Sequence, residues 1–245
     1  MFVRDSVKDS LLSYAGVRDP GTGIVWGGVI SNAGLVQLKW DARREGVYAT
    51  FRYSDLRGQN VPDNTAIDGN AGMYFNLLRK PFLGVALGLS VGGMHYDKNL
   101  NFFSFGQGGY FSPQEYYQAS VPLTVSGGHN RFQYELLASG GVQHFLEDSS
   151  PVYPMQGGAT LLPASLYSSD VHTEPNYNAT FRTNYRVTDH VNFGLFASAN
   201  NSRNFATQAF GFSLKFLFHR VPTDPDLRVH SIPDWRGNEP FDLHQ

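Results

Sequence analysis

The stretch Tyr177-Asn-Ala-Thr-Phe-Arg-Thr-Asn-Tyr-Arg-Val187 alternates mostly apolar side chains with polar ones. Successive side chains of a β-strand point to opposite faces, so a strand with this sequence has one apolar face and one fully polar face. Strands of outer-membrane barrels show this alternation in segments of about 10 residues, with the apolar face toward lipid and the polar face toward the lumen. The stretch therefore predicts a membrane-crossing strand whose lumen-facing side chains include Asn178, Arg182, Asn184 and Arg186.

The same period of two recurs in three other stretches. Residues 191–200 and 210–219 each place aromatic and aliphatic side chains at alternate positions, and their opposite faces carry Asn192 and Lys215. Residues 83–91 alternate leucine and valine with glycine, alanine and serine. We expect Asn192, Lys215 and the small residues of 83–91 to face the lumen.

About ten strands are predicted in all. The connections between them alternate between short ones at 42–45, 79–81, 128–130 and 188–190 and long ones at 55–66, 96–115 and 145–175. Outer-membrane barrels have tight periplasmic turns and longer extracellular loops. Two further hairpins, at 30–34 and 200–206, are shorter than this rule favours. The predicted strands are residues 24–32, 34–41, 46–54, 67–78, 82–95, 116–127, 131–144, 176–187, 191–200 and 206–219.

These features predict an all-β fold, an antiparallel transmembrane β-barrel of the outer-membrane type. We expect an N-terminal connector at 1–23, barrel strands and loops at 24–220 and a Pro-rich periplasmic tail at 221–245. Four prolines in that tail argue against a ladder strand. A loose chain end and a segment that docks into the lumen are both compatible with the tail sequence.

Composition excludes several other classes. Charged residues make up 16% of the chain, below the roughly 25% of soluble domains. The mean hydropathy is −0.30, and the longest weakly polar run, Pro81–Met94, is shorter than the ~18 residues of a spanning helix. The chain has no cysteine and a net charge of −2, which argues against disulfide scaffolds and against nucleic acid as a partner. A soluble β-sandwich also alternates, but its polar face usually carries many Lys and Glu residues.

Residues 1–10 contain neither the basic stretch nor the apolar core of a signal peptide. We therefore expect the chain to be a piece of a longer exported protein.

Four motifs carry a resemblance to a known family. They are Asp9-Ser-Leu-Leu-Ser-Tyr-Ala-Gly-Val-Arg-Asp-Pro20, Val25-Trp-Gly-Gly-Val29, Gly108-Gly-Tyr-Phe-Ser-Pro-Gln-Glu-Tyr-Tyr117 and Val229-His-Ser-Ile-Pro-Asp-Trp-Arg-Gly237. With them the chain resembles the C-terminal outer-membrane β-barrel domain of cellulose synthase operon protein C over nearly its whole length.

The resemblance implies a non-catalytic channel that exports cellulose, a β-1,4-glucan, from the periplasm to the cell surface. It also implies a sixteen-stranded pore preceded by periplasmic tetratricopeptide repeats. Through these repeats the protein would have the inner-membrane cellulose synthase complex as a partner. Both features are missing here, and ten strands would enclose too narrow a lumen for a hydrated polysaccharide. We therefore expect the C-terminal part of a larger pore, with the cellulose chain and outer-membrane lipid as its other partners and no cofactor.

A glucan path needs aromatic faces for sugar rings and neutral polar groups for their hydroxyls, in many weak contacts. The long loop and the tail supply aromatic candidates for the path or its gate. The alternative is that the loop aromatics pack the loop on itself or lie in the interfacial girdle. The candidates are Tyr96, Phe102, Phe103, Phe105, Tyr110, Phe111 and Trp235.

Two other functions remain open. His95 and Asp97, with nearby serines, resemble fragments of the catalytic triad of an outer-membrane hydrolase acting on lipid or glycan. A purely structural barrel is the other alternative. The sequence predicts no metal site, because no carboxylates cluster at ligand spacing and no cysteine is present.

Overall fold

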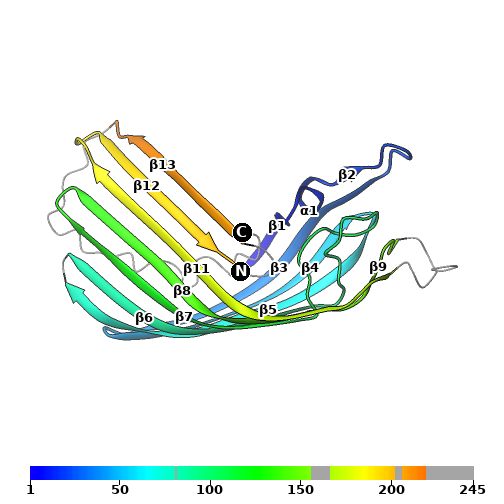
Figure 1. The fold of residues 1–245 in the computed structure, drawn as a ribbon, viewed down its shortest axis with the longest axis horizontal. Helices are drawn as coiled ribbons and strands as arrows, with labels where there is room; N and C mark the ends of the chain where they lie inside the picture. The colour runs from blue at the N-terminus through cyan, green and yellow to red at the C-terminus, as the bar shows by residue number, and fades with distance from the viewer. Residues whose placement is uncertain (81, 156–165, 202–205, 219–245) are drawn as a thin grey trace.

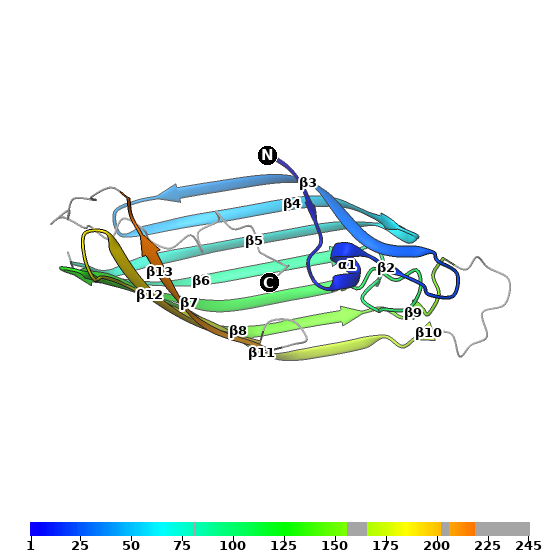
Figure 2. The ribbon, with the colours of Figure 1, turned by 90° about the horizontal axis from the view of Figure 1, so that it is seen from above.

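The computed structural model describes residues 1–80, 82–155, 166–201 and 206–218, and most of them form one antiparallel sheet. Figure 1 shows the sheet curved into a trough with one concave and one convex face, and Figure 2 shows the same strands from above. The sheet does not close on itself among these residues. Its ten strands, in spatial order, are β1 (Phe2–Ser6), β3 (Val25–Asp41), β4 (Glu45–Gln59), β5 (Val61–Lys80), β6 (Leu83–Tyr96), β7 (Glu115–His129), β8 (Phe132–Glu147), β11 (Asp170–Arg186), β12 (Val191–Asn200) and β13 (Thr207–Phe216).

Smaller elements lie at one end of the sheet, which carries the long connections and is called the loop end below. They are α1 (Leu11–Ala15), β2 (Val17–Arg18), which pairs with β3, and the two-residue pair β9 (Ser150–Pro151) and β10 (Leu166–Tyr167). The opposite end, called the turn end, carries tight turns at 42–44, 130–131 and 187–190. In the described part of the chain, no helix is long and apolar enough to span a membrane.

The N-terminal segment is part of the sheet. Residues 1–23, expected as a connector, contribute β1, α1 and β2, and β1 pairs with β3 from Phe2 opposite Gly34 to Ser6 opposite Ile30. The proposed tail at 221–245, including Trp235, lies outside the described residues.

The hairpin predicted at 30–34 is wrong, because β3 runs through it as one strand. Gly34 is paired on both sides, with Phe2 of β1 and Tyr53 of β4, and this pairing keeps the backbone extended through Gly34. The irregularity lies earlier, in a bulge between Gly27 and Ile30. Gly27 has a φ of 95° and α1 packs against it, so that a Cβ at this position would collide with the carbonyl oxygen of Leu12.

The long loop predicted at 55–66 is also wrong. Strands β4 and β5 extend toward each other until they meet in a tight turn at Asn60, whose φ is 47°. The segment is largely polar, but its inward positions still alternate. Leu56, Val61 and Ala66 are all buried in one apolar cluster at the loop end.

As far as Phe216, the register places the predicted apolar sets of 83–91, 177–187, 191–200 and 210–219 on one face of the sheet and their alternate sets on the other. Asn178 is opposite Asn200, and Asn192 is opposite both Arg186 and Lys215, so the predicted polar side chains share one face. The apolar members of the same strands share the other, convex face, which is largely exposed. Its exposed members include Leu87, Leu89, Val91, Tyr177, Phe181, Tyr185, Phe193, Leu195, Phe210, Phe212, Leu214 and Phe216.

Two tyrosines of the concave face lie across glycines of the neighbouring strand. Tyr48 is in register with Gly72, and Gly46 is in register with Tyr74. A Cβ at Gly72 would collide with the Tyr48 phenol, and a Cβ at Gly46 with the Tyr74 phenol. Both rings are buried, with 5% and 1% of their surface exposed for Tyr48 and Tyr74. The two Tyr–Gly pairs interlock β4 with β5.

Candidate functional site

The concave face carries many uncharged hydrogen-bonding side chains beside its charged ones, and cross-strand bonds connect several of the uncharged groups. The Tyr48 hydroxyl donates to Ser90 Oγ at 3.1 Å, and Ser90 Oγ donates to Asn70 Oδ1 at 3.1 Å. This chain of bonds spans β4, β6 and β5. A face of hydroxyl and amide groups can exchange hydrogen bonds with a polar ligand without binding it as a fixed charge would.

A second network lies nearer the loop end, on β7, β8 and β11. The Tyr116 hydroxyl donates to Gln118 Oε1 at 3.0 Å, and Asn176 Nδ2 donates to the same oxygen at 3.3 Å. Gln143 Nε2 donates to Glu174 Oε1 at 2.8 Å. Asn176 has the same strand parity as the six predicted lumen-facing residues, so those residues share the face on which this network lies.

In the described part of the concave face, two ion pairs join neighbouring strands. Arg52 Nε lies 2.7 Å from Asp68 Oδ2, and the side chains are only 15% and 11% exposed. Arg182, one of the predicted lumen-facing residues, lies 3.6 Å from Glu135 through Nη1 and Oε2. Pairing of opposite charges in register weakens the local field of this wall.

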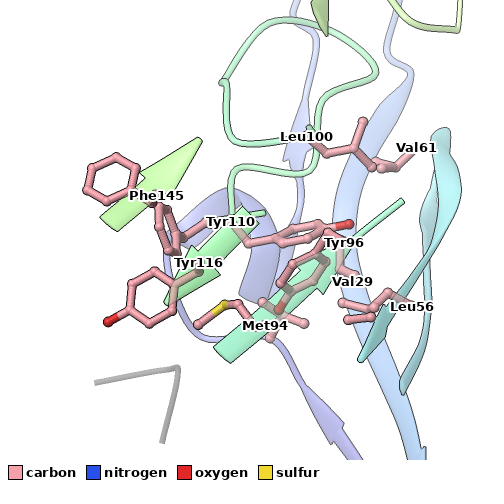
Figure 3. Packing of buried hydrophobic residues seen from close by; sticks show 12 residues of the cluster. Val29, Leu56, Val61, Met94, Tyr96, Leu100, Tyr110, Tyr116 and Phe145 are labelled. Atoms are coloured by element: carbon pink, nitrogen blue, oxygen red, sulfur yellow. The ribbon is translucent and has the colours of Figure 1, made fainter. Parts of the chain in front are cut away.

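At the loop end the connection from β6 to β7, residues 97–114, folds back over the concave face, and we call it the inner loop. Figure 3 shows Leu100 and Tyr110 of this loop packed against side chains of the sheet. Tyr110 is 1% exposed and its ring centroid lies 6.0 Å from that of Tyr96. Phe111 meets Phe145 edge-on at 5.6 Å. The buried cluster consists of Val7, Val29, Leu56, Val61, Ala66, Met94, Tyr96, Leu100, Tyr110, Phe111, Tyr116 and Phe145.

Buried polar side chains hold the inner loop to its neighbours. Asn64 Nδ2 of β5 donates to the Lys98 carbonyl at 2.9 Å and to the Tyr110 hydroxyl at 3.0 Å. Gln107 Nε2 donates to Ser150 Oγ and to the Pro151 carbonyl. Buried amides with two partners each fix a loop far more firmly than surface contacts do.

The helix α1 covers the inner loop from the N-terminal side. Its N-cap residue Ser10 donates from Oγ to the Gly109 carbonyl at 2.6 Å, and Asp9 Oδ2 accepts from the Phe111 amide at 2.9 Å. Gly109 has a φ of 66°, and a Cβ there would press on Ser10 and Leu12. The motif around Asp9 and the motif around Gly108, far apart in sequence, are thus parts of one contact.

Glu147 ends β8 at the loop end and touches the inner loop. Its Oε1 accepts from Asn101 Nδ2 at 2.9 Å. Burial raises the pKa of the Glu147 carboxyl above its ordinary value, the bond from Asn101 lowers it, and the nearby Asp170 carboxylate raises it further while His172 lowers it. Asp170 and His172 are themselves paired at 2.8 Å on β11.

The structure brings the predicted aromatic candidates to the loop end but gives them different environments. Tyr96, Tyr110 and Phe111 are buried in the cluster. Phe102 stacks on Tyr167 with ring centroids 3.6 Å apart, and Phe105 is tilted against Trp26 at 5.4 Å. Phe103 is 65% exposed. Packing of the loop on itself and on the wall therefore accounts for five of them, while Phe103 presents its ring to the outside.

Sequence reasoning missed the inner-face residues of β4, β5, β7 and β8. The amides Asn64, Gln118 and Gln143 and the pair of Arg52 with Asp68 lie in stretches where apolar and polar residues alternate less regularly. Their common signal is an uncharged or paired polar residue at every second position of a strand.

His95 and Asp97 lie side by side on the loop end without forming a triad. His95 Nε2 is 3.9 Å from Asp97 Oδ1, and His95 Nδ1 is within hydrogen-bond distance of the Gln114 carbonyl. Both ring nitrogens are thus directed at groups other than serine, whereas a triad needs one of them against the nucleophile. No group of three potential metal-ligating side chains occurs among the residues that the structure describes.

An antiparallel sheet with an apolar convex face, a polar concave face and its long connections at one end has the architecture of the antiparallel transmembrane β-barrels of the outer-membrane type. Within that class, residues 1–219 match the family described as cellulose synthase operon protein C C-terminus, and the chain belongs to this family.

Three relatives illustrate the match. Cellulose synthase operon protein C of Pseudomonas fluorescens is 33% identical over 229 residues, which cover 92% of this chain and 18% of that protein. Cellulose synthase 2 operon protein C of Komagataeibacter xylinus is 37% identical over 78% of this chain and 15% of its own length. The Escherichia coli K12 protein is 31% identical over 95% of this chain and 21% of its own length. The chain thus spans about a fifth or less of these relatives.

Proposed function

We propose that this chain forms part of the wall of an outer-membrane channel that exports cellulose from the periplasm to the cell surface without catalysing a reaction. The observation that carries the proposal is the concave face of linked hydroxyl and amide groups, as in Tyr48, Ser90 and Asn70. A glucan moving past such a wall trades one hydroxyl hydrogen bond for another at each step. Many weak contacts permit conduction, whereas a few strong ones would hold the polymer.

The inner loop belongs to the same proposal. It packs over the loop ends of β4 to β8. The predicted polar residues Asn178, Arg182 and Asn184 follow β11 from there toward the turn end, on the same concave face. The glucan leaves along this side. Among the aromatic candidates that the structure describes, Phe103 has the most exposed ring, at 65%, and we expect it to contact a sugar face.

Membership of the cellulose synthase operon protein C family supports cellulose as the polymer, and the paired ring nitrogens of His95 support a non-catalytic role. The inner-membrane cellulose synthase complex supplies the energy through chain elongation, and it reaches the channel through periplasmic repeats outside this chain. Outer-membrane lipid surrounds the convex face.

The test is single-channel recording on the full-length protein in planar bilayers, with cello-oligosaccharides added on either side. We expect a large conductance that these sugars block reversibly, with no reducing sugar released from them. A folded, heat-modifiable protein whose conductance is indifferent to cello-oligosaccharides would refute the export path.

A further inference from the structure

The convex face of β3 to β6 has a groove of about 710 Å³ near the turn end. Ala49 and Ala71 form its floor, in register between the larger Leu38 and Val91. In the next row toward the turn end, Trp40 and Leu89 border the groove, with 56% of each side chain exposed. Small residues flanked by large ones on four neighbouring strands give the sheet a hollow instead of an even apolar surface.

A hollow of this size is within the ~300–1,000 Å³ range of small-molecule sites. Its lining is almost entirely apolar, which suits a hydrocarbon chain. An acyl chain that fills the groove makes dispersion contacts with its floor and both sides. It is therefore held more firmly than a lipid chain lying on a flat face.

Basic side chains gather beside the same groove. Arg43 and Arg44 lie in the turn that follows β3, and Arg79 of β5 reaches that turn, where its Nη1 donates to the Arg43 carbonyl at 2.7 Å. All three side chains are exposed. Trp40 precedes Arg43 by three residues, or roughly 10 Å of extended chain. The nearby carboxylates are Glu45 and Asp41, and Asp41 is paired with Lys39 at 3.2 Å.

We propose that this groove and the arginine pair Arg43 and Arg44 bind one anionic glycerophospholipid, with an acyl chain over Ala49 and Ala71 and the phosphate at the two guanidinium groups. Arg79 is in register with Gly84 of the concave face and only supports the turn, through its bond to the Arg43 carbonyl. Planar guanidinium forks match phosphate oxygens in pairs, which lysine does not do. The groove requires an acyl chain, and the arginines require an anionic head group. The two parts of the site are about 10 Å apart along the chain, so one lipid molecule can occupy both. The site rests on the membrane placement proposed above, and it is independent of cellulose export.

The test uses the full-length protein in phosphatidylcholine nanodiscs that contain a small, equal fraction of dibrominated phosphatidylglycerol or dibrominated phosphatidylcholine. Bromine quenches tryptophan on contact, and the groove signal is the difference between the protein and its Trp40→Phe variant. We expect phosphatidylglycerol to quench at about fivefold lower mole fraction, the factor that one basic side chain contributes at an anionic lipid surface.

Two variants separate the halves of the site. The double variant Arg43→Gln/Arg44→Gln should reduce the head-group preference toward one, and Ala71→Leu should fill the groove and lower quenching by the anionic lipid. The matched control is Arg131→Gln, since Arg131 also donates to a turn carbonyl, that of Val187, at the turn end. This control should leave the preference unchanged.

Equal quenching by the two lipids, or a preference that survives Arg43→Gln/Arg44→Gln, would overturn the site while leaving the export proposal intact. Absence of any Trp40 quenching would instead overturn the membrane placement, and the lipid site with it.

Discussion

Replacing Tyr110 by alanine should release the inner loop from the wall. The side chain is 1% exposed, and its hydroxyl accepts from Asn64 Nδ2 at 3.0 Å. Truncating a buried aromatic residue costs about 3–5 kcal/mol through lost transfer energy and the cavity left behind. Asn64 Nδ2 keeps its second partner, the Lys98 carbonyl, so an orphaned donor adds little to this cost. At about 1.4 kcal/mol per factor of ten, the equilibrium constant for loop opening should rise roughly 100- to 4,000-fold.

Hydrogen exchange measures this opening directly. The amides of Gly108 and Gly109 both donate to the Leu100 carbonyl, at 3.1 and 2.9 Å, and exchange only when the loop opens. Tyr110→Ala should accelerate both and raise the single-channel conductance of the full-length protein. The control is Phe103→Ala in the same loop, where a 65% exposed ring leaves no cavity. Equal exchange rates in the two variants, or less than tenfold acceleration in Tyr110→Ala, would refute the view that the cluster holds the loop in place.

Three further outcomes are expected of the full-length protein. Gly84→Trp should reduce cellulose secretion while insertion stays normal, because position 84 is on the concave face, whereas Leu87→Trp on the convex face should secrete normally; equal secretion would contradict the assignment of faces. Arg52→Ala should lower the unfolding free energy by about 3 kcal/mol in a urea titration in vesicles, because it removes the ion-pair partner of the largely buried Asp68 carboxylate. Arg52→Leu combined with Asp68→Leu should cost clearly less. The folded loop end binds more protons at Glu147 than the unfolded one, since burial raises its pKa. Protection of the loop from exchange should therefore fall as pH rises from about 4.5 through the folded pKa, and Glu147→Gln should abolish this dependence.

The faces of the strands could be predicted from the sequence because a lipid-facing side must be apolar throughout. In β6, β11, β12 and β13 one row is mostly apolar, and the opposite row is mostly polar or small apart from Phe196, so a period of two is evident. The pattern weakens where strands extend toward the loop end. Residues 55–66 are polar on both sides apart from a few buried apolar positions, and their pairing rests on backbone bonds that leave little trace in the sequence.

The inner loop illustrates a different limit. The sequence groups its aromatic residues in one segment, but their roles depend on which rings face the wall. Tyr110 and Phe111 are buried because α1 and Asp9, about 100 positions earlier in the chain, close over them. No local pattern in residues 97–114 contains that contact.

The interlocked pairs of Tyr48 with Gly72 and of Tyr74 with Gly46 bear on how the strands find their partners. Alternation penalises a slip of one residue, since every side chain would change face, but a slip of two leaves all faces as they were. Sliding β5 by two in one direction would set Tyr48 against Tyr74, and in the other direction Gly46 against Gly72. The first arrangement has two rings in the space of one, and the second leaves a hole. The two Tyr–Gly pairs thus destabilise two-residue register shifts, which the alternation of apolar and polar residues does not disfavour.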